Sequence, residues 1–594
     1  MKIKHLFGLA VIAAMTASCS SNEDLGTAGP GTGTNEAGVG YVAFNINLPT
    51  QSGSSSRAGS ENDQFDAGTP NEYDVKDATL LIFEGSSESS AQFKGAYTLN
   101  TAPWKDNGKT DNITTTSATI VKQIDTPASS GHCYALVVLN KNGVFTVDET
   151  AKTITLKGAT ATFSGTYKDF AESLSEENLT NNGFYMANAP LASVAGGATD
   201  PAGAEINTLA TLDGKIKEKE SEAKSAPAQI YVERGVAKVT MQNTSSPTKV
   251  DGSTKFGGTS TVDFKITSWV LDNTNKKTYL VRSTDGFDDW TSLASNSTTL
   301  LPANKYRFIG SNAVADHLYR TYFAKDANFD QPGNSAALTA GDLVTNPNPT
   351  FVDKFGNDNP QYCFENTFDA ACQKDQYTTR VLIKAKLNSG ETFYVFNGDQ
   401  NTIYLIDKVK NEIKKYYLIE NEAWIKANVT PAPTKSEVDG DDLDVKISDA
   451  AGQVSITSIS FKPGVTISSS ATVPTNYDEV LKRIGSIQEY KDGESYYFVR
   501  IKHFGDDMTP WNTDETTKPS TSSIYPEDHL KENYLGRYGV LRNNWYDIAV
   551  EGVKGLGSAV VPKVTPNTDD ELKSYIAVKI NVLSWAKRSQ SVVL

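Results

Sequence analysis

The residue types that most often perform catalysis are sparse in this sequence and poorly spaced for it. The histidines form no HExxH motif and no i,i+4 pair, which would place two imidazoles on one face of a helix. GxSxG and GxxxxGK[ST] motifs are absent, and no GxGxxG follows a strand-like run. We therefore predict that the protein is not an enzyme and holds no metal ion or cofactor. The five histidines are His5, His132, His317, His503 and His529.

Carboxylates occur in groups, but their pattern favours solvated surface. Adjacent acids such as Glu176 and Glu177, or Asp506 and Asp507, are most often exposed. The acidic run at residues 439–444 could offer hard oxygen ligands to calcium. It lacks the EF-hand spacing and a distal glutamate, so we interpret it as a solvated loop.

Cys19 follows a segment that has the features of a signal peptide. A basic start and an apolar run over residues 6–15 precede Thr16, Ala17 and Ser18, which lead into the cysteine. This order resembles a bacterial lipobox and predicts a lipoprotein signal peptide over residues 1–18, with lipidation, including palmitate, at Cys19. Because no other run is apolar enough to span a bilayer, attachment to the outer membrane would depend on acyl chains and would end with one proteolytic cut.

The other three cysteines have less specific surroundings. Cys133 lies in an apolar, strand-like run and is predicted to be a small buried residue. Cys363 and Cys372 could form a loop disulfide in an oxidising compartment, and two free thiols are the equal alternative. Their spacing fits no zinc pattern.

The overall composition is typical of a β-rich extracellular protein. The 594 residues include 26 tyrosines and 44 glycines, and 21% are charged, a balance that favours strands and turns. The formal net charge of −15 comes without a basic patch, which argues against a nucleic-acid partner.

Many short period-2 runs separated by turn residues predict an all-β protein built of sandwiches. One helix is predicted over residues 411–429, and long ordered surface loops over 283–378. The predicted strands are 41–49, 78–83, 119–124, 132–139, 153–156, 230–241, 262–271, 277–282, 379–387, 391–396, 453–461, 496–503 and 540–550.

The first strand is followed by an exposed loop that a protease could reach. Residues 51–60 are rich in Ser and Gly and contain a single basic residue, Arg57, followed by Ala58. Loops of this composition are preferred sites of proteolysis.

The last twenty residues read as a strand without a following partner. Ile576, Val578, Ile580 and Val582 alternate with Ala577, Lys579 and Asn581, and Leu583 follows directly. After Trp585 the chain becomes polar and cationic, and it ends on an apolar triplet that includes Val592 and Leu594. Such an apolar edge must be covered. It either pairs inside its own domain or completes a sheet in another molecule.

The order of these features resembles the type V pilins of Bacteroidia, and within them the minor-fimbria major-subunit (fimbrillin) family. The likeness covers nearly the whole chain, except for residues 283–378 and 505–535, where no pattern can be aligned. It depends on four motifs in this order: Ser56-Arg57-Ala58-Gly59 after Leu48-Pro49, the VERGVAK run at 232–238, the RNNWY run at 542–546, and VLSW at 582–585 with the apolar C-terminus.

The resemblance implies a fold and a domain order. The fold is two transthyretin-like β-sandwich domains in tandem plus a C-terminal donor strand. The expected segments are the signal peptide (1–18), a propeptide with tether and removable first strand (19–57), the N-terminal sandwich (58–227), the C-terminal sandwich (228–574) and the donor strand (575–594).

It also implies a two-step assembly. An arginine-specific protease cuts after Arg57, which makes Ala58 the mature N-terminus and frees the first strand; the C-terminal strand of a neighbouring copy then enters the groove by β-strand addition. The implied partners are further copies of the chain, anchor and tip fimbrial subunits, and that protease, at the cell surface. The removable strand contributes Tyr41, Ala43, Phe44, Ile46 and Leu48. The donor strand contributes Ile576, Val578, Ile580, Val582, Leu583, Trp585, Val592 and Leu594.

A shaft subunit that supports adhesion or biofilm formation is therefore the predicted function. An accessory or tip subunit is one alternative. A monomeric surface glycan-binding lipoprotein is the other, but it leaves the Arg57 loop and the C-terminal strand without a role. A secreted hydrolase has no catalytic constellation behind it.

Overall fold

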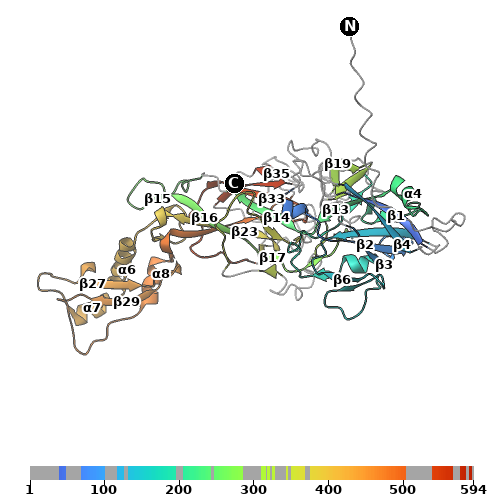
Figure 1. Cartoon of the computed structure of the whole chain (residues 1–594). Helices are drawn as coiled ribbons and strands as arrows, with labels where there is room; N and C mark the ends of the chain where they lie inside the picture. The colour runs from blue at the N-terminus through green and yellow to red at the C-terminus, as the bar shows by residue number, and fades with distance from the viewer. Residues whose placement is uncertain are drawn as a thin grey trace, which may run out of the picture.

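The computed structural model describes residues 39–47, 68–100, 117–125, 131–194, 205–242, 247–284, 309–315, 317–321, 324–327, 343–344, 349–367, 375–503, 538–565, 576–583 and 588–591. Strands dominate these residues, which confirms the all-β class. The elements lie along an elongated body (Figure 1). The transthyretin-like character, the number of domains and the donor strand stay predictions. No helix among the described residues is both long and apolar enough to cross a membrane.

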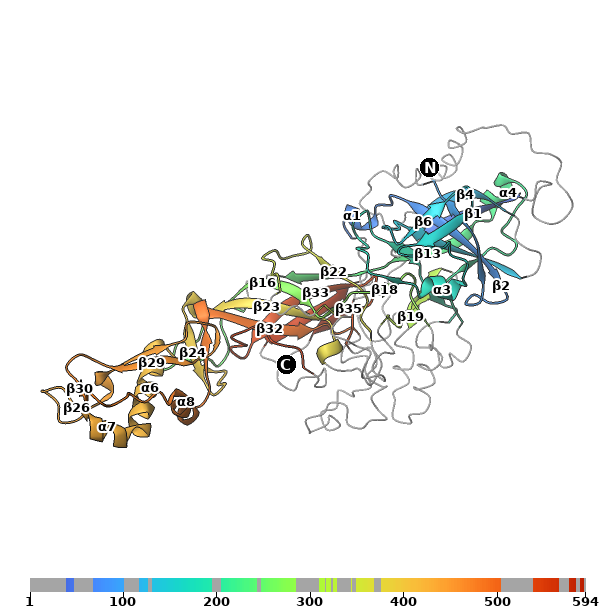
Figure 2. The same cartoon turned by 90° about the horizontal axis from the view of Figure 1, so that it is seen from below.

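The first sheet lies at one end of the body and contains the first strand of the chain (Figure 2). Its strand order is β3-β2-β5-β9-β13-β1-β4, and β12 pairs with β5 beside this path. The strands are β1 (Val39–Asn47), β2 (Ala78–Gly85), β3 (Gln92–Thr98), β4 (Ser117–Asp125), β5 (His132–Leu139), β9 (Met186–Asn188), β12 (Ala210–Thr211) and β13 (Ala228–Arg234).

The core of this end is made by the inward side chains of the first sheet and the elements packed on it. Phe83, Phe145 and Phe170 are fully buried there, and the ring of Phe170 contacts Phe145 edge-on and Phe83 at a tilt. Aromatic packing of this kind adds to the area term that drives burial. The elements beside the sheet are α3 (Tyr167–Ala171), α4 (Glu220–Ser225), β6 (Phe145–Asp148) and β7 (Thr153–Leu156).

The middle of the body is a two-layer sandwich. One layer has the order β22-β14-β33-β34-β35 and the other β16-β23-β32. Both layers supply one apolar core, for example Met241 and Ile548 from the first and Trp269 and Ile383 from the second. The strands are β14 (Ala237–Gln242), β16 (Phe264–Asp272), β22 (Gln361–Cys363), β23 (Arg380–Leu387), β32 (Glu494–Arg500), β33 (Trp545–Val553), β34 (Ile576–Leu583) and β35 (Arg588–Ser591).

A module with its own core forms the opposite end (Figures 1 and 2). It is inserted between β24 and β31, which pair with each other. The predicted helix at 411–429 is found there, but it begins earlier and is broken at Asn421 into α6 and α7. The elements are β24 (Phe393–Phe396), β25 (Thr402–Ile403), α6 (Ile406–Glu420), α7 (Glu422–Asn428), β26 (Val429–Thr430), η7 (Gly440–Asp442), β27 (Leu443–Ile447), β28 (Gly452–Gln453), β29 (Ile456–Phe461), β30 (Thr466–Ile467), α8 (Tyr477–Ile484) and β31 (Ile487–Tyr490).

Short elements connect these parts. The four-stranded sheet β11-β10-β20-β19 joins residues of the first half to the region beyond 308. The elements are α1 (Pro70–Tyr73), β8 (Leu174–Ser175), β10 (Leu191–Ala192), β11 (Ile206–Asn207), β15 (Thr254–Lys255), β17 (Thr274–Asn275), β18 (Thr278–Tyr279), β19 (Ile309–Ala315), β20 (Leu318–Thr321), β21 (Leu343–Val344), η5 (Asp375–Tyr377), η6 (Asn388–Gly390) and η8 (Lys491–Gly493).

The segment predicted as one strand at 230–241 is two strands with a joint between them. Residues 228–231 of β13 pair with β1, residues 232–234 pair with β9, and β14 pairs with β33 in the sandwich. At the joint, a Cβ on Gly235 would lie 2.9 Å from Cδ1 of Tyr185 and 3.1 Å from Cδ1 of Leu179. Glycine is required there by close approach. The domain boundaries stay predictions, although β13, which follows the expected boundary at 227, is hydrogen bonded within the first sheet.

Candidate assembly site

The first strand lies inside the first sheet rather than at its edge. β1 is antiparallel to β4 along its whole length, from Val39 opposite Asp125 to Asn47 opposite Ser117. On its other side, residues 44–47 run parallel to the start of β13. The backbone of Tyr41 exchanges hydrogen bonds of 2.8 and 2.9 Å with that of Lys217. Both edges of β1 are therefore paired.

Both faces of β1 are covered as well. Val42, Phe44 and Ile46 point into the core of the first sheet and are fully buried. Ala43 is also fully buried, although it lies on the opposite face of the strand, whereas Tyr41 is half-buried. Leu48 lies outside the described residues. Burying three large apolar side chains stabilises the strand by roughly 5–9 kcal/mol before entropy is counted.

Loss of β1 would leave a gap in the sheet. Among the described strands, β4 is paired with β1 alone. Without β1, the backbone groups of β4 and of the first half of β13 would lose their partners, and a buried unpaired backbone group costs free energy. The site that β1 occupies is thus a groove with two hydrogen-bonding walls and an apolar floor.

The C-terminal strand pairs with another strand of the same chain. β34 is antiparallel to β33, from Trp545 opposite Leu583 to Val553 opposite Ile576, and β35 turns back on it. The predicted donor positions from Ile576 to Leu583 are all within β34. Of the two alternatives for covering this strand, the single chain adopts the one inside its own domain. Trp585, Val592 and Leu594 lie outside the described residues.

The other predicted site residues are covered only in part. Cys19, Arg57, Ala58 and Cys372 lie outside the described residues. Cys363 is buried, and desolvation raises the pKa of its thiol to about 12. Because Cys372 is not described, a disulfide between the two stays a prediction. Cys133 is buried as expected. In the described ranges, no three His, Cys, Asp or Glu residues lie close enough to hold a metal ion.

The VERGVAK motif builds a buried charge cluster between the first sheet and the sandwich, which sequence analysis did not find. The Lys238 Nζ lies 2.8 Å from Glu72 Oε1, and both side chains are at most 1% exposed. The Tyr362 hydroxyl donates to the same oxygen at 2.5 Å, and the Arg234 Nε donates to the Glu72 backbone carbonyl at 2.8 Å. The ammonium also lies 3.9 Å from the centroid of the Trp545 ring. We call these five residues the Glu72 cluster.

Electrostatics in this cluster favour the ionised carboxylate. Burial alone raises the pKa of Glu72, but the Lys238 charge, the hydrogen bonds from Lys238 and Tyr362 and the Arg234 charge outweigh it, so the pKa is lowered. Its partner Tyr362 shows the reverse, since burial and the neighbouring Glu72 raise the pKa of its hydroxyl. The sequence signal that could have predicted this cluster is the pattern of opposite charges around Gly235 in the VERGVAK motif.

The RNNWY motif meets the VERGVAK motif at this joint. Arg542 Nε donates to Glu365 Oε2 at 3.0 Å, with both side chains buried. Asn543 has a φ of 60°, a left-handed conformation that asparagine tolerates, and its N–H donates to the Val236 carbonyl at 2.8 Å. Glu233 pairs with Arg282 at 2.6 Å. The two motifs thus lock the turn between β13 and β14.

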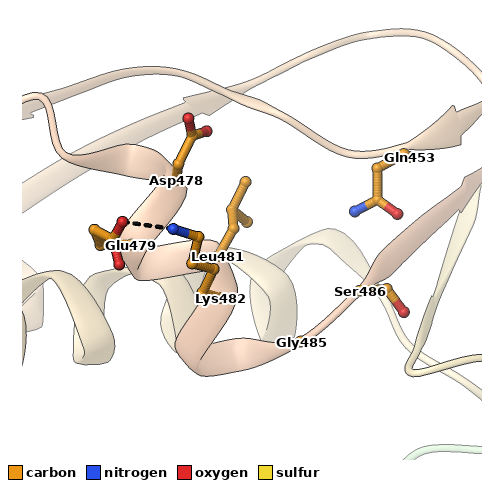
Figure 3. Close-up of a pocket in the computed structure, with 7 residues that line it drawn as sticks. All are labelled: Gln453, Asp478, Glu479, Leu481, Lys482, Gly485 and Ser486. Atoms are coloured by element: carbon orange, nitrogen blue, oxygen red, sulfur yellow. Dashed lines mark hydrogen bonds and ion pairs between the residues drawn. The ribbon is translucent and has the colours of Figure 1, made fainter.

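Two hollows lie away from the strand groove. A shallow one of about 520 Å³ on the terminal module lies beside α8, where Glu479 and Lys482 pair at 2.6 Å, and Gln453 and Ser486 also line it (Figure 3). Another of about 300 Å³ in the first half is lined by Glu88, Tyr167 and Arg282, among others. Burial raises the pKa of Glu88 to about 7, although the backbone N–H groups of Thr208 and Leu209 donate to it.

Residues 488–591 match the family model described as "Major fimbrial subunit protein type IV, Fimbrillin, C-terminal". The C-terminal part of this chain is therefore similar to the C-terminal region of fimbrillins. The matched region contains the RNNWY motif and the strands β32, β33, β34 and β35, and it thus includes the C-terminal strand and the strand on which it lies. The match relates this part of the chain to fimbrial subunits as a class.

The comparison with solved structures aligns most of this chain with several of them, at low identity and low TM-score. One is a proposed cell adhesion protein from Parabacteroides distasonis, with 10% identity, 93% of this chain and 97% of that chain covered, and a TM-score of 0.32. Another is the C-terminally truncated tip fimbrial protein Mfa3 from Porphyromonas gingivalis, with 9% identity, 92% and 100% covered, and a TM-score of 0.30. No curated protein matches the chain by sequence.

Proposed function

We propose that the chain is a shaft subunit of a cell-surface fimbria, exported as a lipoprotein through Cys19 and matured by cleavage after Arg57. In this proposal β1 leaves after the cut, and the C-terminal strand of a neighbouring copy takes its place. The contact is head-to-tail and does not close on itself, so it generates a filament.

The observation that carries the proposal is a shared pattern in two strands. Residues 42–48 read VAFNINL and residues 576–582 read IAVKINV. Alanine, isoleucine and asparagine recur at the same three places, and the three positions that face the core in β1 correspond to Ile576, Val578 and Ile580. A strand with this period and these side chains fits a groove built for β1.

The pairing of β1 specifies how the incoming strand would run. If it takes the register of β1, it lies antiparallel to β4 and parallel to β13, with Ile580 at the place of Ile46. Its outward residues, such as Lys579, then replace Asn45, which is only half-buried.

A reconstitution from purified parts tests the proposal. The chain without residues 575–594 is cut with an arginine-specific protease and mixed with a synthetic peptide of residues 575–594. We expect tight binding only after the cut, with loss of binding for the Ile580→Asn peptide. The Lys579→Asn peptide is the matched control, because it changes an outward position. Binding that ignores the cut, or tolerates Ile580→Asn, contradicts the proposal.

The full-length chain provides the second arm and separates shaft from tip. Cut precursor should form polymers. The Arg57→Ala precursor and the chain without residues 575–594 should stay monomeric. On cells, antibody against a shaft subunit labels the whole fibre. Labelling at the fibre end alone would assign the chain to a tip or accessory role instead.

A further inference from the structure

We infer that the Glu72 cluster is a retention site: it keeps the N-terminal segment that begins at Thr69 bound to the sandwich when β1 leaves the first sheet. The inference deepens the proposed function and rests on it, because it presumes a cut after Arg57. It assigns a role to α1 and to the VERGVAK motif that strand exchange itself does not supply.

The position of Glu72 in the chain is the first argument. β1 ends at Asn47, and the chain is described again from Gly68, directly before α1. Arg57 lies between the two, so a cut there separates β1 from α1 and leaves residues 58–69 in front of the helix. Two local hydrogen bonds fix the start of this segment. Glu72 Oε2 accepts from the Thr69 N–H at 2.7 Å, and the Thr69 carbonyl accepts from the Glu72 N–H at 2.8 Å.

The partners of Glu72 are the second argument, since most come from the other part of the protein. Lys238 is in β14, Tyr362 in β22 and Trp545 in β33, all strands of the sandwich. Tyr362 also packs its ring edge-on against Phe184 of the first core, with centroids 4.8 Å apart. The sandwich therefore presents a cation, a hydroxyl and an aromatic wall to one carboxylate of the N-terminal segment.

Burial makes this contact hard to reverse. Glu72 and Lys238 are excluded from water, so separating them would leave two buried charges without their ion pair, which is costly. By contrast, the ion pair between Lys76 and Asp74, a few residues further along the segment, is exposed, so water can solvate both charges when they separate. The segment is thus anchored at one residue.

The cluster also spans the joint that connects the groove to the C-terminal strand. Arg234 is the last residue of β13, and the first half of β13 is one wall of the groove. Lys238 lies in β14, which pairs with β33, and β33 pairs in turn with β34 in the same sheet. Both residues bond to Glu72, one to its carbonyl and one to its carboxylate. When β1 leaves, this contact holds β13 in place for the incoming strand.

Hydrogen exchange before and after the cut tests the inference on the full-length chain. In the wild type, amides of residues 69–73 and 236–242 should stay protected after the cut, while β4 loses protection. In Glu72→Gln, we expect exchange of both segments to rise about tenfold or more after the cut. Tyr362→Phe keeps the ion pair and should show a smaller rise, which guards against a variant that fails to fold.

The matched control is Asp77→Asn, which removes a part-exposed pair with Lys141 at 3.2 Å in the first half of the protein. It should leave both segments protected. If wild-type residues 69–73 exchange freely after the cut, or if Glu72→Gln protects them as well as wild type does, the inference is overturned. If instead the wild type keeps this protection but never binds the 575–594 peptide, strand exchange fails and the retention site stands.

Discussion

Two strands from opposite ends of the chain share a pattern of residues but occupy different places in the fold. β1 lies inside a sheet between two long neighbours, whereas β34 lies near the end of another sheet, where the four residues of β35 are the last strand among those described. Removal of β34 and β35 shortens a sheet at its end. Removal of β1 opens a sheet in its interior. Under the proposed strand exchange, this difference teaches why β34 would be the strand that is donated and β1 the strand that is replaced.

The largest expected effect is on the core side of β1. Phe44→Ala should destabilise the uncut protein by about 3–5 kcal/mol, because Phe44 is fully buried in the first core. Val578→Ala, the corresponding position of the C-terminal strand, should cost the uncut protein much less and should instead weaken polymer formation. Denaturant unfolding and light scattering measure the two effects. Equal destabilisation by both would break the comparison.

The joint between the two regions should be nearly as sensitive. Lys238→Met leaves the Glu72 carboxylate buried without its cation and should cost about 3–5 kcal/mol in the free energy of unfolding. Denaturant unfolding followed by tryptophan fluorescence measures it, because Trp545 lies against this lysine. A change below about 1 kcal/mol would mean that the groove and the sandwich are not coupled through this residue.

A dependence on pH should distinguish the half that contains β1. The pKa of Glu88 is raised by burial to about 7, so this group favours the folded state below pH 4.5, and that contribution is lost as pH rises through 7. The melting temperature of the first half should therefore fall between pH 5 and pH 8, and Glu88→Gln should flatten the decline. Calorimetry at several pH values measures it. A melting temperature that rises over this window would contradict the sign.

The smallest effect is expected at the outward position of β1. Asn45→Lys introduces the residue that the C-terminal strand has at the corresponding place, Lys579. Because Asn45 is only half-buried, stability should change by less than about 0.5 kcal/mol, and the cut protein should polymerise normally. The melting temperature and the rate of polymer growth are the measurements. A strong loss would show that the outward face of β1 also specifies the groove.

Sequence reasoning predicted those parts of the fold that have a local period. The alternation at 41–49 and at 576–582 corresponds to β1 and β34, and apolar spacing predicted the helix that became α6 and α7. It did not predict that β13 changes partners along its length, because pairing is decided by residues far away in the chain. The Glu72 cluster was missed for the same reason, since Glu72 is distant in sequence from Lys238, Tyr362 and Trp545.

The sequence by itself determined that the chain is β-rich, that it carries motifs resembling those of fimbrillins in order, and that two of its strands share one pattern. These properties depend on neighbouring residues and on spacing of two along a strand. Only the tertiary structure decided that β1 is an interior strand and that β34 rests on β33. It also decided that the VERGVAK and RNNWY motifs meet at one joint, because burial and ion pairing between distant segments exist only in the folded chain.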